Sequence, residues 1–391
     1  MTIRKTLTCP ACEQTDLLEL PIPHPENSML SDGQTLKCVL RKMSCCDCGH
    51  CFHAAPPTQE DLLKLFDENY SLGQRDPSAE VHRAELYAEA IMEFLAENSI
   101  AWPQRLVEIG CGMGSLLSLL AGRWNCQSAA GIEPSQQLAT AALTKCPENA
   151  VVHQCAAEDL PMQEFCGFDL CLSVNVAEHT LAPSEFLRKC NSTVTDAGHI
   201  LVICPDGEQP SSELLFYDHM SSFTDASLTS FAKQAGLRKV ASRSLTGGLQ
   251  GFRAHLLDQD NQFPETVSSS YQDLSKQRIE FLERWCQGCS TLGLALREND
   301  YAIFGTGEFA DLLATYCAPI VENATYFVVD NSVVESYRGK PVIDTKTFIS
   351  LEDLKLVAAV HERSWPAVHK RFRSLGAEIF HPYCQNPKMG S

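Results

Sequence analysis

A glycine-rich turn over residues 108–114, with the sequence EIGCGMG, most tightly limits what this chain can fold into. It follows the apolar pair Leu106-Val107 and precedes a segment with a helical pattern from Ser115, so we expect a strand, a turn and a helix in that order. Three glycines let the backbone turn sharply and approach a ligand closely, because a Cβ atom would obstruct one or the other. The turn therefore suits a nucleoside ligand at the end of a strand.

A second acidic residue, Glu133, ends the next apolar run over residues 129–132. A carboxylate at this place accepts hydrogen bonds from both hydroxyls of a ribose. Rossmann-type dehydrogenases also combine a glycine turn with an acid about 20 residues further on. These two features therefore leave more than one class of nucleotide-binding protein open.

The surrounding motifs resemble those of class I S-adenosylmethionine-dependent methyltransferases. Residues 108–114 match the acid-x-Gly-x-Gly-x-Gly form of the first motif, residues 133–135 resemble the second, residues 157–161 resemble the acidic loop that holds the adenine amino group, and residues 168–179 resemble the fourth strand with its active-site loop. The resemblance implies a methyltransferase sheet and an S-adenosylmethionine site made by Tyr70, Glu108, Gly110, Gly112, Gly114, Glu133, Pro134, Glu158, Asp159 and Asn175. A Rossmann-like domain for another nucleotide is the alternative.

The pattern from Arg105 to about Asp258 alternates apolar strands with helices, which predicts an α/β domain with a parallel sheet. Residues 198–205 read as its fifth strand. Residues 237–245 and 251–257 suggest a closing antiparallel hairpin, as methyltransferase sheets usually have. With the helix expected from Asp76-Pro77, we place this domain at residues 76–260.

The N-terminal residues, 1–75, are expected to form a zinc-binding domain. Two Cys-x-x-Cys pairs, Cys9/Cys12 and Cys45/Cys48, can supply the four thiolates that Zn²⁺ prefers, and metal binding would replace the core that so small a segment lacks. Glycine directly after the last thiolate favours Cys48 over the competing thiols, which are Cys38, Cys46 and Cys51. Free surface thiols are the alternative.

A second glycine turn starts a smaller Rossmann-like domain, which we place at residues 261–391. Residues 301–304 read as a strand, Gly305-Thr306-Gly307 as the turn before a helix, and residues 326–330 as a strand that ends in an acid. This domain could bind a nucleotide or substrate, or serve only as structure.

The three parts together resemble the sugar C-methyltransferases, which act on nucleotide-linked keto-deoxysugars. In that family a Tyr-His-Glu-His stretch after the fifth strand carries acid/base residues, and the matching residues here are Phe216-Tyr217-Asp218-His219. The resemblance implies that His219 is the base and that Asp218 orients it or contacts substrate. His179, at the end of the fourth strand, is a second candidate for the base or for the enolate partner, and Tyr217 is a candidate for positioning.

Carbon methylation beside a ketone needs a base that forms an enolate, and a neutral imidazole can take that proton near pH 7. The departures at Phe216 and Tyr217 keep a second possibility open, an O- or N-methyltransferase of another small metabolite. A non-enzymatic assembly protein that retains a cofactor fold is the third.

The composition limits partners and location. A formal net charge of -18 argues against broad nucleic-acid binding, which needs a basic surface. We expect no membrane segment, because no apolar run reaches the length of a membrane span, and residues 1–5 lack a signal-peptide pattern. The expected location is the cytoplasm, where most of the 19 cysteines would be thiols or metal ligands.

Overall fold

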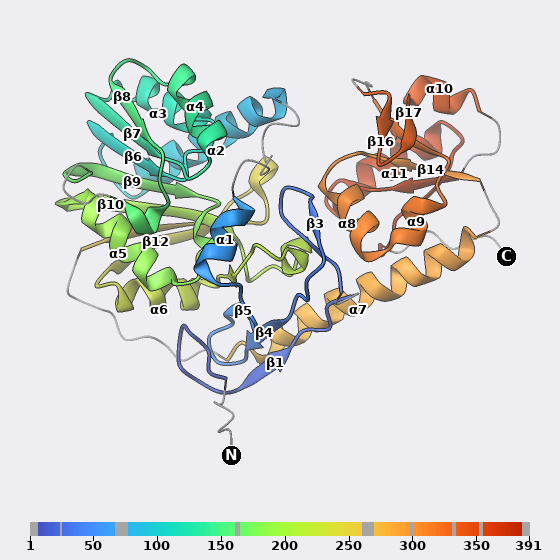
Figure 1. Cartoon of the computed structure of the whole chain (residues 1–391), viewed down its shortest axis with the longest axis horizontal. Coiled ribbons are helices and arrows are strands. Elements are labelled where there is room, and N and C mark those ends of the chain that lie inside the picture. The colour runs from blue at the N-terminus through green and yellow to red at the C-terminus, as the bar shows by residue number, and fades with distance from the viewer. Residues whose placement is uncertain are drawn as a thin grey trace. The chain divides into compact units, whose positions relative to one another are not determined.

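The computed structural model describes residues 7–23, 26–66, 77–160, 165–259, 270–297, 300–330, 334–351 and 355–384. The chain forms two compact units (Figure 1). Unit 1 comprises residues 1–19, 42–214 and 218–276, and unit 2 comprises residues 20–41, 215–217 and 277–391. Tyr70, Asp76 and residues 260–269, which include the predicted boundary between the two Rossmann-like domains, lie outside the described residues.

Unit 1 is built on a seven-stranded sheet in the order β12-β13-β10-β9-β6-β7-β8. Strand β13 runs antiparallel to both of its neighbours, β10 and β12, and the remaining neighbours are parallel. The predicted α/β class and closing hairpin are thus confirmed. The hairpin consists of β12 and β13, which are joined by a 3₁₀ turn, η4 (Gly247–Leu249). The strands are β6 (Arg105–Ile109), β7 (Ser128–Ile132), β8 (Ala150–His153), β9 (Phe168–Val174), β10 (Val194–Pro205), β12 (Arg238–Ser244) and β13 (Phe252–Asp258).

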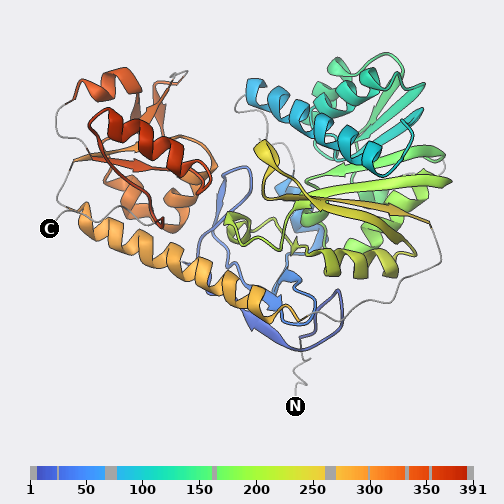
Figure 2. The same cartoon turned by 180° about the vertical axis from the view of Figure 1, so that it is seen from behind.

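Helices cover both faces of this sheet (Figures 1 and 2). Side chains alternate between the two faces along each strand. In β10, Ile200 and Val202 join one core, whereas Leu201 and Ile203 join the other. The first core includes side chains of α5 (Pro183–Thr193) and α6 (Asp225–Gln234), and the second includes side chains of α2 (Pro77–Glu97), α3 (Ser115–Arg123) and α4 (Gln136–Lys145).

The cysteine-rich segment forms a four-stranded antiparallel sheet with the order β1-β4-β5-β11. Three strands come from the N-terminal segment, but β11 follows β10 and lies in the loop that carries the predicted catalytic residues. A short helix, α1 (Gln59–Leu65), follows β5. The strands are β1 (Leu17–Glu19), β4 (Lys42–Cys45), β5 (Cys51–His53) and β11 (Ser221–Ser222).

Unit 2 contains a six-stranded sheet with the order β16-β17-β15-β14-β18-β19, parallel except for the edge pair β16 and β17. Its strands are β14 (Tyr301–Phe304), β15 (Tyr326–Val329), β16 (Ser336–Tyr337), β17 (Lys340–Asp344), β18 (Lys355–Ala358) and β19 (Glu378–Phe380). Its helices are α8 (Glu308–Tyr316), α9 (Ala318–Glu322), α10 (Thr345–Ile349) and α11 (Trp365–Ser374), while α7 (Gln272–Ala295) begins in unit 1 and continues into unit 2 from Gln277.

The long loop between the two cysteine pairs also belongs to unit 2. It forms the hairpin β2 (Ser28–Met29) and β3 (Thr35–Leu36), which contacts α8. The Met29 amide donates to the Tyr316 hydroxyl at 3.3 Å, and the Thr35 and Thr315 hydroxyls lie 2.9 Å apart. These contacts explain why the loop is longer than a zinc knuckle needs.

Among the helices in the described part of the chain, none combines the length and apolar character needed to span a bilayer.

Candidate functional site

The glycine turn joins β6 to α3, as the sequence predicts. Gly110, Gly112 and Gly114 all have left-handed backbones, with φ of 77°, 53° and 75°. A Cβ on Gly110 would lie 2.2 Å from Cγ2 of Val176, and one on Gly114 would lie 2.9 Å from Cβ of Ala142. Gly110 and Gly114 are therefore required by both conformation and space, and Gly112 by conformation.

Two buried carboxylates flank this turn. Glu133, at the end of β7, accepts hydrogen bonds from the amides of Gly112 and Ser135, both at 2.9 Å. Burial raises the pKa of Glu133, although these two hydrogen bonds act to lower it. Burial also raises the pKa of Glu108 well above its usual range, and the nearby Glu133 carboxylate adds to this rise. The Gly112 amide thus fixes the carboxylate that would meet the ribose.

A pocket that is partly open to solvent adjoins the turn. Gly110, Pro134, Glu158 and His179 line it, which places four predicted site residues around one space. Much of the remaining lining is apolar and includes four residues from α1 and its C-terminal end: Gln59, Leu62, Leu63 and Phe66. The Phe66 ring also meets the His179 ring edge to face, with centroids 5.2 Å apart. Helix α1 therefore forms part of the pocket wall, a role that its sequence did not reveal.

Asn175 stands at the carboxyl end of β9 in a left-handed conformation, with φ of 56°. Its amide donates to the Ile203 carbonyl at 2.8 Å, and its Nδ2 donates to the Tyr87 hydroxyl at 3.0 Å. Such a backbone is uncommon for a residue other than glycine and clusters at functional sites. The bonds to β10 and α2 hold the start of the following loop in place.

Histidines and carboxylates gather where that loop meets the segment after β10. One side-chain nitrogen or oxygen from each of Glu178, His179 and His219 lies within 4.8 Å of the others. The two imidazole rings are nearly perpendicular, with centroids 4.9 Å apart. Nδ1 of His179 lies 2.8 Å from the Asp218 carbonyl oxygen and 3.6 Å from its carboxylate. The structure thus brings together three of the four predicted catalytic residues.

Burial gives the members of this cluster different protonation behaviour. It lowers the pKa of His179 to about 4 despite the Asp218 carboxylate, and it raises the pKa of Glu178 to about 7 despite His219. Burial also disfavours charge on His219, but Glu213, Asp218 and Glu178 outweigh it and raise the pKa of His219 above its ordinary value. His179 is therefore a neutral imidazole at pH 7, whereas His219 holds a proton more readily.

Sequence reasoning gave no role to three residues of this cluster, which are Glu178, Glu213 and Lys42. Glu213, in the 3₁₀ turn η3 (Ser212–Leu215), lies 3.6 Å from Nδ1 of His219, and Lys42 donates from Nζ to the Glu213 carbonyl at 3.3 Å. Glu213 and Lys42 are buried, with 6% and 1% exposure. In the sequence both look like ordinary surface charges, and no motif marks either of them.

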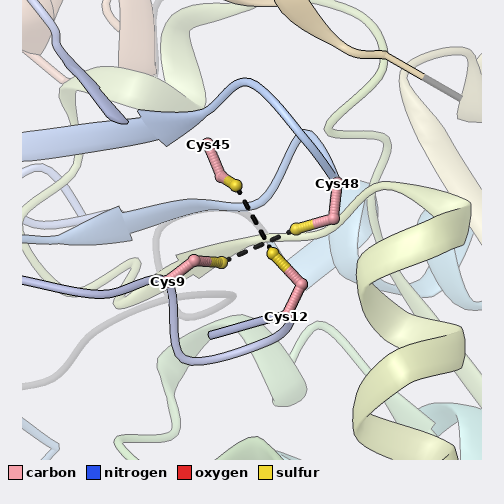
Figure 3. Close-up of side chains that lie close together, drawn as sticks. All are labelled: Cys9, Cys12, Cys45 and Cys48. Atoms are coloured by element: carbon pink, nitrogen blue, oxygen red, sulfur yellow. Dashed lines mark hydrogen bonds between the residues drawn. The ribbon is translucent and has the colours of Figure 1, made fainter. Parts of the chain in front are cut away.

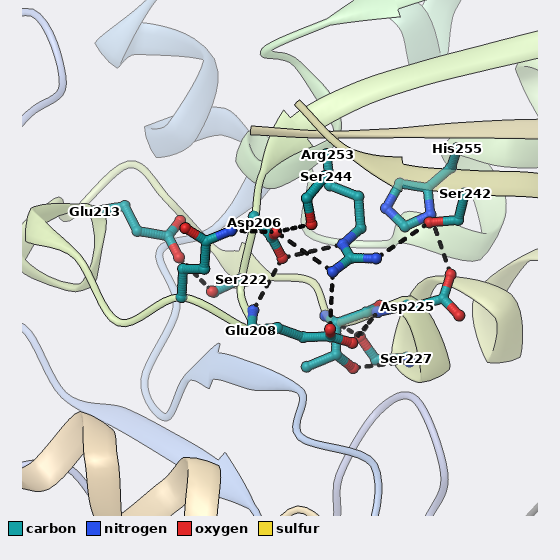
Figure 4. A network of polar contacts seen from close by, with 12 residues as sticks. Asp206, Glu208, Glu213, Ser222, Asp225, Ser227, Ser242, Ser244, Arg253 and His255 are labelled. Carbon is teal, nitrogen blue, oxygen red and sulfur yellow. Dashed lines mark hydrogen bonds and ion pairs between the residues drawn. The ribbon is translucent and has the colours of Figure 1, made fainter. Parts of the chain in front are cut away.

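A polar network holds the two ends of the segment that contains His219 (Figure 4). Asp206, directly after β10, accepts from Nε of Arg253 at 3.0 Å and from the Ser244 hydroxyl at 2.6 Å. Arg253 also donates to Glu208 at 2.8 Å, and Glu208 accepts from the Asp225 amide at the start of α6 at 3.1 Å. The segment between β10 and α6 is thus tied to the sheet at its beginning and its end.

Four cysteine sulfurs converge in the N-terminal sheet (Figure 3). Cys9 and Cys48 have their Sγ atoms 3.6 Å apart, Cys12 and Cys45 have theirs 3.5 Å apart, and all four atoms lie within 4.8 Å of one another. A tetrahedral zinc with bonds of about 2.3 Å would hold its sulfurs about 3.8 Å apart. The four residues chosen from the sequence therefore meet in a geometry that fits a zinc ion.

The two cysteine pairs adopt the same backbone turn. The Glu13 amide donates to the Cys9 carbonyl at 2.8 Å, and the Gly49 amide donates to the Cys45 carbonyl at 3.0 Å. Both residues that follow a second cysteine are left-handed, with φ of 61° at Glu13 and 70° at Gly49. Glycine is therefore favoured directly after the second cysteine of a pair, because this position has a left-handed backbone. Glu13 adopts the same backbone at a greater conformational cost.

Two further residues predicted for the site, Asp159 and Tyr217, are not among the residues that line the pocket. Asp159 is exposed in η1 (Ala157–Asp159). Tyr217 is half-buried, is assigned to unit 2 and donates its amide to the Met29 carbonyl at 2.7 Å. The predicted contribution of Tyr70 lies outside the described residues.

The second glycine turn, in unit 2, is explained by local packing. Gly305 has φ of 104°, and a Cβ there would lie 2.8 Å from the Ala359 carbonyl oxygen. The acid after β15, Asp330, accepts from Nη1 of Arg371 and from the Thr345 hydroxyl, both at 2.9 Å. A nucleotide at this edge would therefore meet a carboxylate that is already paired.

A family model described as a methyltransferase domain matches residues 79–242. No curated protein matches the chain.

Similar solved structures include a S-adenosylmethionine-dependent methyltransferase from Clostridium acetobutylicum, 11% identical, which covers 45% of this chain and 91% of that chain with a TM-score of 0.38. Magnesium protoporphyrin IX methyltransferase from Synechocystis with bound SAH is 14% identical, with 46% and 84% coverage and a TM-score of 0.37. An O-methyltransferase from neocarzinostatin biosynthesis is 21% identical, with 48% and 59% coverage and a TM-score of 0.36.

Proposed function

We propose that this chain, whose residues 79–242 match a family model described as a methyltransferase domain, is an S-adenosylmethionine-dependent enzyme that methylates a carbon next to a ketone in a nucleotide-linked sugar. The observation that carries the proposal is the buried cluster of two histidines and several carboxylates beside the pocket. A phenol or an amine acceptor loses its proton far more readily than a carbon next to a ketone, which needs a positioned base. A cluster of this kind therefore favours carbon as the methylated atom.

The cofactor would lie at the carboxyl ends of β6 and β7. Gly110 and Gly112 would approach its sugar and tail, Glu133 would accept from the ribose hydroxyls, and Glu158 would face the adenine. The sulfonium supplies an activated methyl group, so this chain must align the acceptor and remove its proton. The apolar side chains from α1 would exclude water from that step.

His219 is the proposed base. Its imidazole would take the proton from the acceptor carbon, and the bond electrons would form the enolate that attacks the methyl carbon. Neutral His179 beside it holds its one ring proton on Nδ1, against the Asp218 carbonyl oxygen, so its bare Nε2 would accept a proton and His179 is the alternative base. Asp218 supports His179 through the contact of its carbonyl oxygen with Nδ1 at 2.8 Å.

We propose that unit 2 binds the nucleotide part of the substrate, which is called the nucleotide handle below. Strand β14 lies between β15 and β18 in a parallel sheet, and ligands of open α/β sheets bind at such a switch point outside the carboxyl ends of the strands. Calorimetric titration of the protein, preloaded with S-adenosylhomocysteine, against nucleoside diphosphates tests this handle. Saturable binding supports it, and binding of intact acceptor without any diphosphate binding would contradict it.

We also infer that Cys9, Cys12, Cys45 and Cys48 bind one structural Zn²⁺. The support is the spacing of their sulfurs and the matching turns that present them. Four thiolates would leave no open position for catalysis, so the ion would act by stabilising the N-terminal sheet.

Transfer of a labelled methyl group from S-adenosylmethionine tests the activity. The acceptor panel holds nucleotide-linked keto-sugars together with hydroxyl and amine compounds, and product analysis identifies the methylated atom. His219→Gln should lower kcat at least about a hundredfold while S-adenosylhomocysteine still binds. His199→Gln is the matched control, because His199 lies towards the amino end of β10, away from the segment that contains His219, and should keep both properties.

A product methylated on oxygen or nitrogen would overturn the carbon assignment. Full turnover by His219→Gln would overturn the choice of base. Binding of S-adenosylhomocysteine without methyl transfer to any acceptor would argue for a different substrate class or for a binding protein.

A further inference from the structure

We propose that Glu213 is the positioning residue for His219, holding Nδ1 of the imidazole so that Nε2 exchanges the proton with substrate. The inference rests on the proposed function, because it assigns the partner of the proposed base. No sequence motif contains Glu213, and the resemblance to sugar C-methyltransferases gives this residue no role.

The geometry of the pair is fixed on both sides. Oε2 of Glu213 lies 3.6 Å from Nδ1 of His219, and the two side chains are 7% and 6% exposed. This distance is longer than a hydrogen bond, and contacts of catalytic groups commonly tighten when substrate binds. The second carboxylate oxygen, Oε1, accepts from the Ser222 hydroxyl (Figure 4). Lys42 binds the Glu213 carbonyl, so both the side chain and the backbone of Glu213 are restrained.

The cysteine-rich sheet, β1-β4-β5-β11, holds the chain next to His219. Ser222 pairs with Cys51 across β11 and β5, and the His53 amide donates to the Met220 carbonyl at 3.0 Å. A shift of β11 would move His219 and the Ser222 hydroxyl together. The strand that follows the proposed base is thus set in register by its pairing with the cysteine-rich sheet.

The charges around the pair favour an ionised Glu213. Burial opposes its ionisation, but His219, Lys42 and Ser222 together hold the pKa of Glu213 below its ordinary value. The groups that bear on the His219 charge from the neighbouring elements are Glu178, Glu213 and Asp218. His179 also faces His219, and Lys42 binds the Glu213 carbonyl.

The proton can be followed through the proposed step. The C–H bond of the acceptor breaks, the proton moves to Nε2 of His219, and the electron pair forms the enolate. The enolate carbon then bonds to the methyl carbon, and the electrons of the breaking S–C bond return to sulfur, giving S-adenosylhomocysteine. Glu213 stays ionised and stabilises the imidazolium until its proton passes to solvent.

The test is an NMR titration of ¹³C-labelled histidines in the complex with S-adenosylhomocysteine, with the His219 resonance assigned by its loss in His219→Gln. Glu213→Gln should lower the pKa of His219 by about one unit, because it removes an adjacent negative charge. Glu208→Gln is the matched control from the same segment. Glu208 binds Arg253 instead, so this variant should leave the His219 titration unchanged.

Kinetics add a second readout. Glu213→Gln should lower kcat about tenfold to a hundredfold with little change in KM and move the acidic limb of the kcat profile to lower pH. Glu213→Asp, which keeps the charge, should restore part of kcat and the position of that limb. Equal pH profiles for Glu213→Gln and wild type would reduce Glu213 to a structural residue.

A variant that removes only a hydrogen bond covers the case in which Glu213→Gln does not fold. Ser222→Ala should raise the pKa of His219 by a fraction of a unit, because a carboxylate that loses a donor attracts the imidazolium proton more strongly. A His219 titration that neither variant moves would overturn the pairing. If Glu213→Gln moves the titration but wild type methylates no acceptor, the proposed function fails while the contact stands.

Discussion

At the scale of single residues, Gly110 shows how little freedom the cofactor turn has. Its backbone is left-handed and its position leaves no room for a methyl group beside Val176. Gly110→Ala should therefore reduce the affinity for S-adenosylhomocysteine at least about tenfold and destabilise the fold by more than the roughly 1 kcal/mol of a left-handed alanine. Calorimetry and urea unfolding measure the two effects.

Gly236→Ala separates conformational strain from the clash. Gly236 follows α6 with φ of 77°, but a Cβ there would meet no atom within 4 Å. This variant should lose about 1 kcal/mol and keep cofactor affinity. Equal effects of the two substitutions would show that the Val176 contact does not constrain the turn.

The residues of the site differ in how far the sequence reveals them. Gly110 and Glu133 follow from a motif, because a turn at the end of a strand has local backbone requirements. Glu213 and Lys42 do not, because a buried charge is distinguished from an exposed one only by what folds over it. The assignments of catalytic roles to His219 and His179 stay predictions.

At the scale of elements, the pairing of β5 with β11 links the cysteine cluster to the proposed base. Cys48→Ala should reduce bound zinc from about one ion per chain to none, since three ligands bind it weakly. It should also speed amide exchange over residues 42–53 and 216–224, because the strand pairing loses its support. Metal analysis and hydrogen–deuterium exchange check both results.

Cys51→Ala is the control for this prediction. Cys51 is buried in β5 but lies outside the group of four sulfurs. Its replacement should keep the zinc, whatever it costs in packing. Loss of zinc in Cys51→Ala with retention in Cys48→Ala would reverse the ligand assignment, and a metal-free folded wild-type protein would remove it.

At the scale of the whole molecule, buried histidines predict that acid weakens the fold. Burial lowers the pKa to about 3 for His53 and His255 and to about 4 for His179 and His381. In the unfolded chain the pKa of each histidine is about 6.5, which is higher than these folded-state values. Between the folded and unfolded pKa the unfolded state therefore binds more protons than the folded state. The stability is fully present above pH 6.5 and is lost as pH falls, by up to about 1.4 kcal/mol per pH unit for each histidine.

The free energy of unfolding in urea at pH 7.0 and 5.5 measures this loss. His255→Gln should make the change between the two pH values smaller, because His255 is fully buried beside Asp225. His82→Gln, at an exposed position of α2, should leave the change as in wild type. A His255→Gln variant with the wild-type pH dependence would contradict this origin of acid sensitivity.

The sequence by itself determined the parts of this protein that depend on neighbours along the chain. Hydrophobic periodicity predicted the methyltransferase strands and the closing hairpin, and backbone requirements marked the glycine turn and one knuckle glycine. Only the tertiary structure decided which distant segments meet. It gave residues 20–41 to unit 2, added β11 to the cysteine-rich sheet and set Glu213 against His219. The physical reason is that periodicity and turn chemistry act over a few residues, whereas strand pairing and buried charge contacts depend on the whole packed fold.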